Sequence, residues 1–135
     1  MTFVELEHTA DVMIRVSAPS YEELFTEAAR ALMTVMYGVA AEGTSCCEVS
    51  VDSADPEGLI HDFLSEVLFL SEVNSIVFFA GTIRISDNTI RGTLCGETFD
   101  PAKHRGGSEV KGISYSGLKI VKEHENYILD VIFDV

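Results

Sequence analysis

Two stretches of the chain repeat apolar side chains every three or four positions, which is the period of an amphipathic helix. The first stretch follows Ser20, which together with Glu23 fits the capping box that opens many helices, and Gly38 is a natural helix stop. The second stretch follows Asp55-Pro56, an N-cap and a proline suited to the first helical position, and runs to about Glu72. Its apolar positions are so numerous that we expect the second helix to be the more deeply buried one.

A different pattern, the alternation of apolar and polar residues, predicts strands in the rest of the chain. Short connections, with turn residues at 87–88 and 124–126, make neighbouring strands antiparallel. Because strands precede, separate and follow the two helices, we predict an α+β fold: two helices packed on mainly antiparallel β-sheet layers, in a single domain spanning residues 1–135. The predicted strands lie at residues 3–7, 12–17, 47–51, 76–79, 82–85, 89–94, 110–121 and 127–133.

The composition is that of a folded, acidic protein. Apolar residues make up 47% of the chain and charged residues 23%, and the formal net charge is −13 at pH 7. This charge argues against an extended nucleic-acid surface, which would need lysine and arginine to neutralise phosphates. The charge is uneven, since residues 1–90 carry −12 and residues 91–135 carry −1. A local basic contact is therefore compatible with the second part of the chain.

The sequence predicts neither a membrane span nor a secretory leader. The first five residues lack a basic or apolar leader pattern, and no apolar run reaches the roughly 18 residues of a membrane helix. We therefore expect a soluble, cytoplasmic protein. Its cysteines are odd in number and lack a C-x-x-C spacing, so we expect all three to be reduced and to serve mainly in packing: Cys46, Cys47 and Cys95.

The clearest candidate site combines the two ends of the sequence. Asp134 closes a strongly apolar strand and stands next to the terminal carboxylate of Val135, so two anionic groups repel each other unless water or a cation neutralises them. If Asp11, in the turn after the first strand, lies beside them, three carboxylates converge, and such hard oxygen ligands suit Ca²⁺ or Mg²⁺. The residues alone also allow Asp11 to form an Asx turn and Asp134 to be solvated.

A series of motifs in a fixed order resembles the archease family from about residue 5 to residue 135. One departure follows Lys111, where the family commonly has a Thr-Tyr-His-like sequence and this chain has Ile113-Ser114-Tyr115-Ser116; the roles of Ser114 and Ser116 stay open. The motifs are His8-Thr9-Ala10-Asp11, Glu23-Leu24-Phe25, Asp62-Phe63-Leu64-Ser65-Glu66, Gly96-Glu97, Asp100, Lys103-His104, Glu109-Val110-Lys111 and Phe133-Asp134-Val135.

The resemblance implies an accessory protein and not an enzyme: a non-catalytic activator of an RtcB-type tRNA-splicing RNA ligase, which joins RNA ends using GTP and divalent metal. Such an activator promotes guanylylation of the ligase and its multiple turnover. The family is also linked with modulation of a tRNA methyltransferase. The implied metal ligands are Asp11, Asp134 and Val135. The implied cofactor is a divalent cation, Ca²⁺ in the first place, with Mg²⁺ and Mn²⁺ as alternatives.

Four further residues are candidates for positioning the metal ligands or for contacting a partner: His8, Lys103, His104 and Lys111. His8 could orient Asp11, ligate zinc or make an ordinary hydrogen bond. The polar loop at residues 100–108 lacks the spacing of a P-loop and leads into a strand, so we expect a mobile, basic loop that contacts a partner. His61, beside Asp62, is expected to belong only to the polar face of the second helix.

Two other functions use the same residues. A metal-dependent phosphoesterase would place Asp11 and Asp134 on one ion with His8 or His104 as the base, but no second metal cluster and no nucleophile motif accompany them. A chaperone for tRNA-modifying enzymes, such as a methyltransferase, would use the same surface with a different partner.

Overall fold

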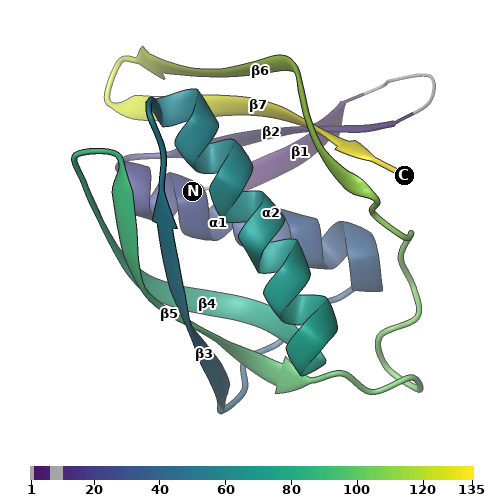
Figure 1. Ribbon diagram of the computed structural model, residues 1–135. Coiled ribbons are helices and arrows are strands. Elements are labelled where there is room, and N and C mark those ends of the chain that lie inside the picture. Colours follow the sequence, from purple (N-terminus) through teal and green to yellow (C-terminus); the bar gives the residue numbers. More distant parts are fainter. Residues whose placement is uncertain (1, 7–10) are drawn as a thin grey trace.

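The computed structural model describes residues 2–6 and 11–135, which form two antiparallel sheets and two helices (Figure 1). Four strands pair in the order β1-β2-β7-β6, and three pair in the order β3-β5-β4. This confirms the predicted α+β class with helices on antiparallel sheets. The elements in chain order are β1 (Thr2–Leu6), β2 (Val12–Ala18), α1 (Tyr21–Tyr37), β3 (Ser45–Asp52), α2 (Pro56–Asn74), β4 (Ile76–Ser86), β5 (Thr89–Thr98), β6 (Gly112–Glu123) and β7 (Asn126–Asp134).

Both helices begin and end for the local reasons that the sequence suggests. The Ser20 hydroxyl accepts a hydrogen bond from the Glu23 amide at 3.2 Å, and a carboxylate oxygen of Asp55 accepts one from the Gly58 amide at 2.7 Å. Gly38 ends α1 with a left-handed backbone, φ 81°. The second helix ends at Asn74, two residues beyond the predicted end, and its C-cap Ser75 is also left-handed at φ 55°.

The core lies where α1 and α2 meet each other and the inner faces of the sheets. α1 packs on β4 and β2, and α2 crosses it to pack on β6 and β3 (Figure 1). The rings of Phe25 and Phe63 join the two helices, with 5.6 Å between their centroids. Along β7 the alternating residues Leu129, Val131 and Phe133 complete the core from above.

The expectation that α2 is the more deeply buried helix is wrong. One of its flanks faces solvent, and Phe69 and Val73 on that flank are exposed. α1 has eight buried residues and α2 has seven, although α2 is the longer helix. The many apolar positions of α2 therefore reflect an apolar surface as well as a buried face.

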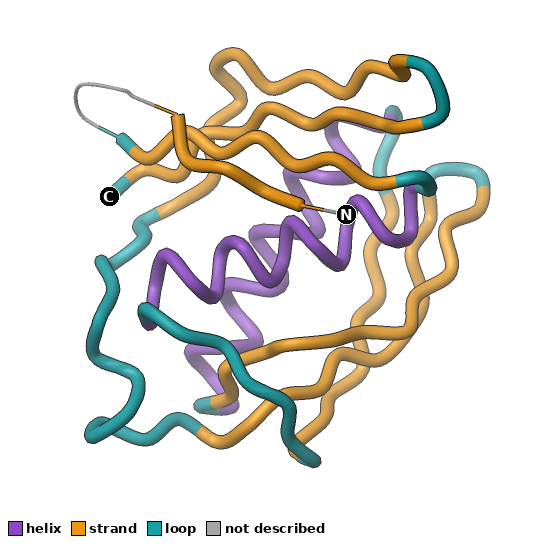
Figure 2. Tube along the Cα trace, turned by 180° about the vertical axis from the view of Figure 1, so that it is seen from behind, coloured by secondary structure: helices purple, strands orange, loops and turns teal. Residues whose placement is uncertain are grey.

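Two strand predictions change in the structure. The segments 76–79 and 82–85 belong to one strand, β4, whose register against β5 shifts between Phe78 and Ala80. The strand predicted at 110–121 begins at Gly112, and its register against β7 shifts between Ser114 and Lys119. The irregular connecting segment, residues 99–111, runs along one side of the molecule from the three-stranded sheet to the four-stranded sheet (Figure 2).

The prediction that all three cysteines are reduced is also wrong. Cys46 and Cys95 are directly opposite each other on β3 and β5, with 4.1 Å between their Cα atoms, and form a disulfide. Cys47 is the free cysteine of the three, and burial raises the pKa of its thiol. The number of cysteines could not predict this disulfide, because the two cysteines are 49 positions apart in the sequence and meet only through the register of β3 against β5.

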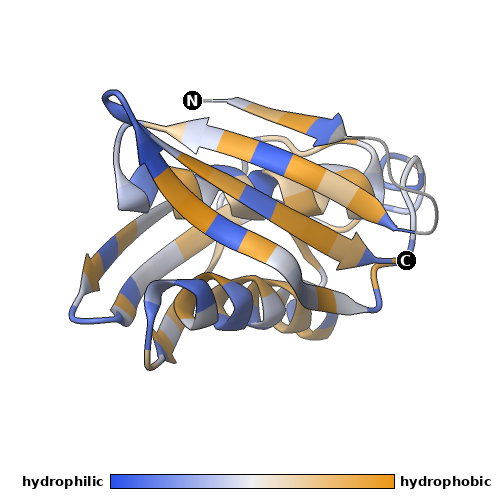
Figure 3. Ribbon diagram, turned by 90° about the horizontal axis from the view of Figure 1, so that it is seen from above, coloured by the Kyte–Doolittle hydropathy of each residue, from blue (hydrophilic) through white to orange (hydrophobic). Residues whose placement is uncertain are grey.

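Hydrophilic residues interrupt the apolar ones along the strands of the four-stranded sheet (Figure 3), and two of them form an ion pair. Arg15 and Asp130 are opposite each other on β2 and β7, and the guanidinium donates to both carboxylate oxygens, at 2.7 and 3.1 Å. The Asp130 carboxylate raises the pKa of Arg15 through this hydrogen bond and through its charge. Within the described residues, no helix is long and apolar enough to cross a membrane.

Candidate metal site

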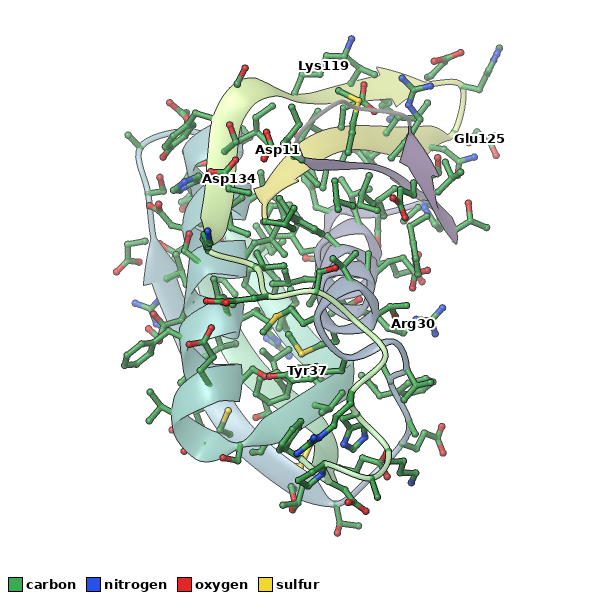
Figure 4. The ribbon with its side chains drawn as sticks, turned by 90° about the vertical axis from the view of Figure 1, so that its right-hand side faces the viewer. Asp11, Arg30, Tyr37, Lys119, Glu125 and Asp134 are labelled. Carbon is green, nitrogen blue, oxygen red and sulfur yellow. A yellow bond between two sulfur atoms is a disulfide. The ribbon has the colours of Figure 1, made fainter. Side chains whose placement is uncertain are left out.

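The pairing of β2 with β7 brings the two predicted aspartates to the same end of the four-stranded sheet. Val12 is opposite Phe133 in an antiparallel register, so the next step of the ladder sets Asp11 beside Asp134. Figure 4 shows both side chains next to each other at this end. The register therefore sets Asp11 and Asp134 side by side, and their joint binding of a cation stays a prediction.

The other neighbour of Asp134 is the start of β6. Gly112 is opposite Asp134, and the Lys111 amide donates a hydrogen bond of 2.7 Å to the Asp134 carbonyl. A methyl group at Gly112 would lie 4.0 Å from a carboxylate oxygen of Asp134. The Asp134 side chain therefore extends over Gly112, which has no side chain of its own. Val135 follows directly and is 39% exposed.

The candidate ligands Asp11, Asp134 and Val135 offer oxygen atoms to a cation. Among residues 2–6 and 11–135, no three side chains of His, Cys, Asp or Glu are grouped so that they could hold a metal ion by themselves. A cation bound to Asp11 and Asp134 would therefore need the carboxylate or carbonyl oxygen of Val135 and water to fill its shell. Such a set fits Ca²⁺, which accepts six to eight oxygen ligands in flexible geometry. His8 lies outside the described residues, so its three alternative roles stay predictions.

Lys103 and His104 do not lie with the aspartates but belong to a separate cluster around Glu97. His104 is 2% exposed, and its Nδ1 accepts a hydrogen bond of 2.8 Å from the Asp100 amide. Its Nε2 then carries the proton and donates to Glu97 at 2.8 Å. Both ring nitrogens are engaged in these hydrogen bonds, so His104 has no nitrogen free to take a proton from water at an ion held by Asp11 and Asp134.

The loop at residues 100–108 is held against α1, in contrast to the mobile loop that we expected. The Gly106 amide donates to the Tyr37 carbonyl at 3.2 Å, and the Ser108 amide donates to the Val35 carbonyl at 2.8 Å. These carbonyls at the helix end have no partner within the helix, so the loop satisfies them. Lys103, at the surface, donates to Glu97 at 2.9 Å, and its predicted contact with a partner stays a prediction.

Glu97→Gln should lower the stability of the protein at neutral pH but not in acid. Hydrogen bonds from Lys103 and His104 lower the pKa of the Glu97 carboxyl below 4.5. The carboxylate therefore stabilises the fold above pH 4.5, and its contribution is lost as the pH falls through the lowered pKa. Urea unfolding between pH 7 and pH 3 should show a gap between wild type and variant that closes toward acid. The exposed Glu125, replaced by Gln, is the control, and a gap independent of pH would contradict the prediction.

A second cluster, around His61, was missed by the sequence analysis. The expectation that His61 belongs only to the polar face of its helix is wrong: its Nε2 lies 2.9 Å from the Ile113 carbonyl and its Nδ1 3.0 Å from an Asp62 carboxylate oxygen. Tyr115 stacks on the His61 ring, with 3.8 Å between centroids. This contact fastens the beginning of β6 to α2. Because this contact joins residues more than fifty positions apart, no local sequence pattern predicts it.

Comparison with known proteins gives the family of the chain. A model of the Archease protein family (MTH1598/TM1083) matches residues 3–135. The chain is 31% identical over 140 residues to the protein archease of Methanopyrus kandleri, with full coverage of both chains. It is 37% identical over 121 residues to the protein archease of Thermococcus kodakarensis, which covers 86% of this chain and 85% of the relative.

Two solved structures share the fold. The solution structure of Methanobacterium thermoautotrophicum protein 1598 superposes with a TM-score of 0.81 at 27% identity and covers 98% of both chains. The crystal structure of an archease from Thermotoga maritima, described as a possible chaperone, gives a TM-score of 0.65 at 24% identity and covers 96% of this chain and 94% of that one. The family match over nearly the whole length and the relatives above 30% identity lead to one conclusion: this chain belongs to the archease family.

Proposed function

We propose that this chain is a non-catalytic, metal-binding activator of an RtcB-type tRNA-splicing RNA ligase, which acts in the cytoplasm and promotes guanylylation and multiple turnover of the ligase. The observation that carries the proposal is the register that sets Asp11 beside Asp134 at the end of the sheet. Membership of the archease family supports it. The engagement of both His104 nitrogens weakens the phosphoesterase alternative, which needs a base beside the ion.

The metal ligands in this proposal are Asp11, Asp134 and Val135. A bound divalent cation, Ca²⁺ in the first place, would offset the repulsion between these carboxylates and present one positive centre to an anionic group of the ligase. The chain's own residues prepare the site before any ion binds. The β2–β7 ladder fixes the spacing of the aspartates, and the hydrogen bond from the Lys111 amide holds the backbone of Asp134.

Asp11→Asn and Asp134→Asn should each abolish activation of the ligase. Removing one charged ligand should weaken Ca²⁺ binding by at least about 10-fold, because even the groups that only orient metal ligands contribute that much. The first measurement is thermal unfolding with Ca²⁺ or with chelator, since an ion at about 100 times its dissociation constant stabilises the folded state by about 2.7 kcal/mol. The second is guanylylation and multiple turnover of the purified ligase with each variant.

Glu125→Gln is the matched control, because Glu125 is an exposed carboxylate at the opposite end of the β6–β7 hairpin from Asp134 (Figure 4). Wild-type activation by both aspartate variants would remove the metal site from the function. Turnover of RNA or phosphoesters by the purified protein alone would favour the enzyme. Binding to a tRNA methyltransferase without any effect on the ligase would favour the chaperone role, in line with the description of the Thermotoga relative.

A further inference from the structure

A groove lies between α2 and the end of the connecting segment. It encloses about 380 Å³ and is lined by residues of both walls. A second hollow, of about 250 Å³, continues around the end of α2 to Tyr37 and Phe99. Glu72 lines both hollows, so they lie next to each other at the C-terminal half of α2. The main lining residues of the larger hollow are Leu68, Phe69, Glu72, Glu109, Val110 and Lys111.

Phe69, which lines this groove, is one of several large apolar side chains that are exposed on α2 or next to it. Of the described residues, the three most exposed large apolar side chains are Val73, Tyr115 and Phe69, and all three belong to α2 or stack against it. Phe69 is 57% exposed and Val73 is 62% exposed. Because they are four positions apart on one helix, they lie next to each other on the same face. An aromatic ring exposed beside a groove is a typical anchor of a protein interface.

The charge around the groove specifies the occupant. α2 carries four acidic residues and neither lysine nor arginine, and Glu109 adds a carboxylate to the opposite wall. Lys111 is the single basic residue among those that line the two hollows. These carboxylates would repel the phosphates of RNA. They would attract a protein surface that presents lysine or arginine around an apolar side chain.

The groove adjoins the candidate metal site. Lys111 lines the groove, and its amide donates the hydrogen bond of 2.7 Å to the Asp134 carbonyl. Val110, one residue earlier, is buried at the base of the groove wall. A partner that reaches Asp134 would therefore also meet the wall of the groove at Lys111.

We propose that this groove docks a basic segment of the partner protein, with an apolar side chain against Phe69 and lysine or arginine against Glu72 and Glu109. The inference rests on the proposed function, because it assigns the segment to the same RNA ligase that meets Asp134. An RNA-joining enzyme holds phosphates through lysine and arginine and so carries surfaces of this chemistry. The acidic groove is complementary to such a surface, and salt should weaken the contact.

The test measures the affinity of the purified ligase for the wild-type protein and four variants, in Ca²⁺ and at two salt concentrations. Phe69→Ser and Glu72→Lys should each weaken binding by about 10-fold or more, as expected for interface anchors, with the Glu72→Lys effect larger at low salt. Val39→Ser and Glu125→Lys are matched controls, since Val39 and Glu125 are exposed residues outside the groove. Stabilisation by Ca²⁺ should be the same in all forms, which separates docking from metal binding.

Three outcomes would overturn the inference. If Phe69→Ser and Glu72→Lys bind and activate the ligase like wild type, the groove is not the docking site, and the proposed function stands without it. If the wild-type protein neither binds nor activates the ligase, the proposed function fails and this inference fails with it. If RNA occupies the groove, and Phe69→Ser abolishes RNA binding, the occupant is not a basic protein segment.

Discussion

Replacing Gly96 by alanine should destabilise the protein by about 3 kcal/mol, at the upper end of the usual cost of overpacking. A Cβ atom at Gly96 would run into the Val77 carbonyl oxygen and lie 2.7 Å from the Phe78 Cα. Both obstacles are backbone atoms of the neighbouring strand β4, so no side-chain rotation can make room. The strand would have to shift at the irregularity between Phe78 and Ala80, next to buried Val77 and Phe78.

Equilibrium urea unfolding of Gly96→Ala and wild type measures this cost. Gly112→Ala is the control, because the nearest atom to its added methyl group would be a carboxylate oxygen of Asp134 at 4.0 Å. The control should change stability by less than about 1 kcal/mol. Equal unfolding midpoints for wild type and Gly96→Ala would show that β4 and β5 are not held in the register described above.

Reduction of the Cys46–Cys95 disulfide should cost about 4 kcal/mol of stability in the chain-entropy description of a loop of this length. The bond joins residues 49 positions apart, so the unfolded chain gains much freedom when it is broken. Thermal unfolding with and without reductant should show a lower midpoint in reductant. The double variant with serine at Cys46 and Cys95 should unfold at the lower midpoint under both conditions.

Cys47→Ser separates this effect from other consequences of a reductant, because Cys47 is the free cysteine. That variant should still lose stability when reductant is added. A midpoint that does not respond to reductant in the wild-type protein would mean that Cys46 and Cys95 are not linked. Since thiols are kept reduced in most cytoplasms, the same experiment also reports how stable the protein is in the compartment we propose for it.

Features that depend on neighbouring residues were predicted well. The caps at Ser20 and Asp55, and the stop at Gly38, are decided within four residues, and the structure confirms all three. The apolar period located both helices for the same reason. It could not say which flank of α2 is covered, because that depends on where β6 and β3 pack.

Features that depend on register between distant strands were predicted poorly or only through the family resemblance. The pairing of Cys46 with Cys95 and the contact of His61 with Ile113 have no local signal. The approach of Asp11 to Asp134 belongs to the same class. The carboxylates near the two ends of the sequence suggested it as one alternative, the family resemblance strengthened the expectation, and the β2–β7 ladder supplies the physical reason why the two residues lie side by side.

The broken register of β6 has a consequence for how the protein behaves at high concentration. β6 is an edge strand, and such edges invite a strand from another molecule to pair with them. Between Ser114 and Lys119 the strand leaves the regular ladder, and Gly117 adopts a left-handed backbone, φ 68°. Lys119 and Lys122 place charges along the remaining part. This edge therefore offers no long, flat run for another strand, which protects an otherwise open sheet from edge-to-edge aggregation.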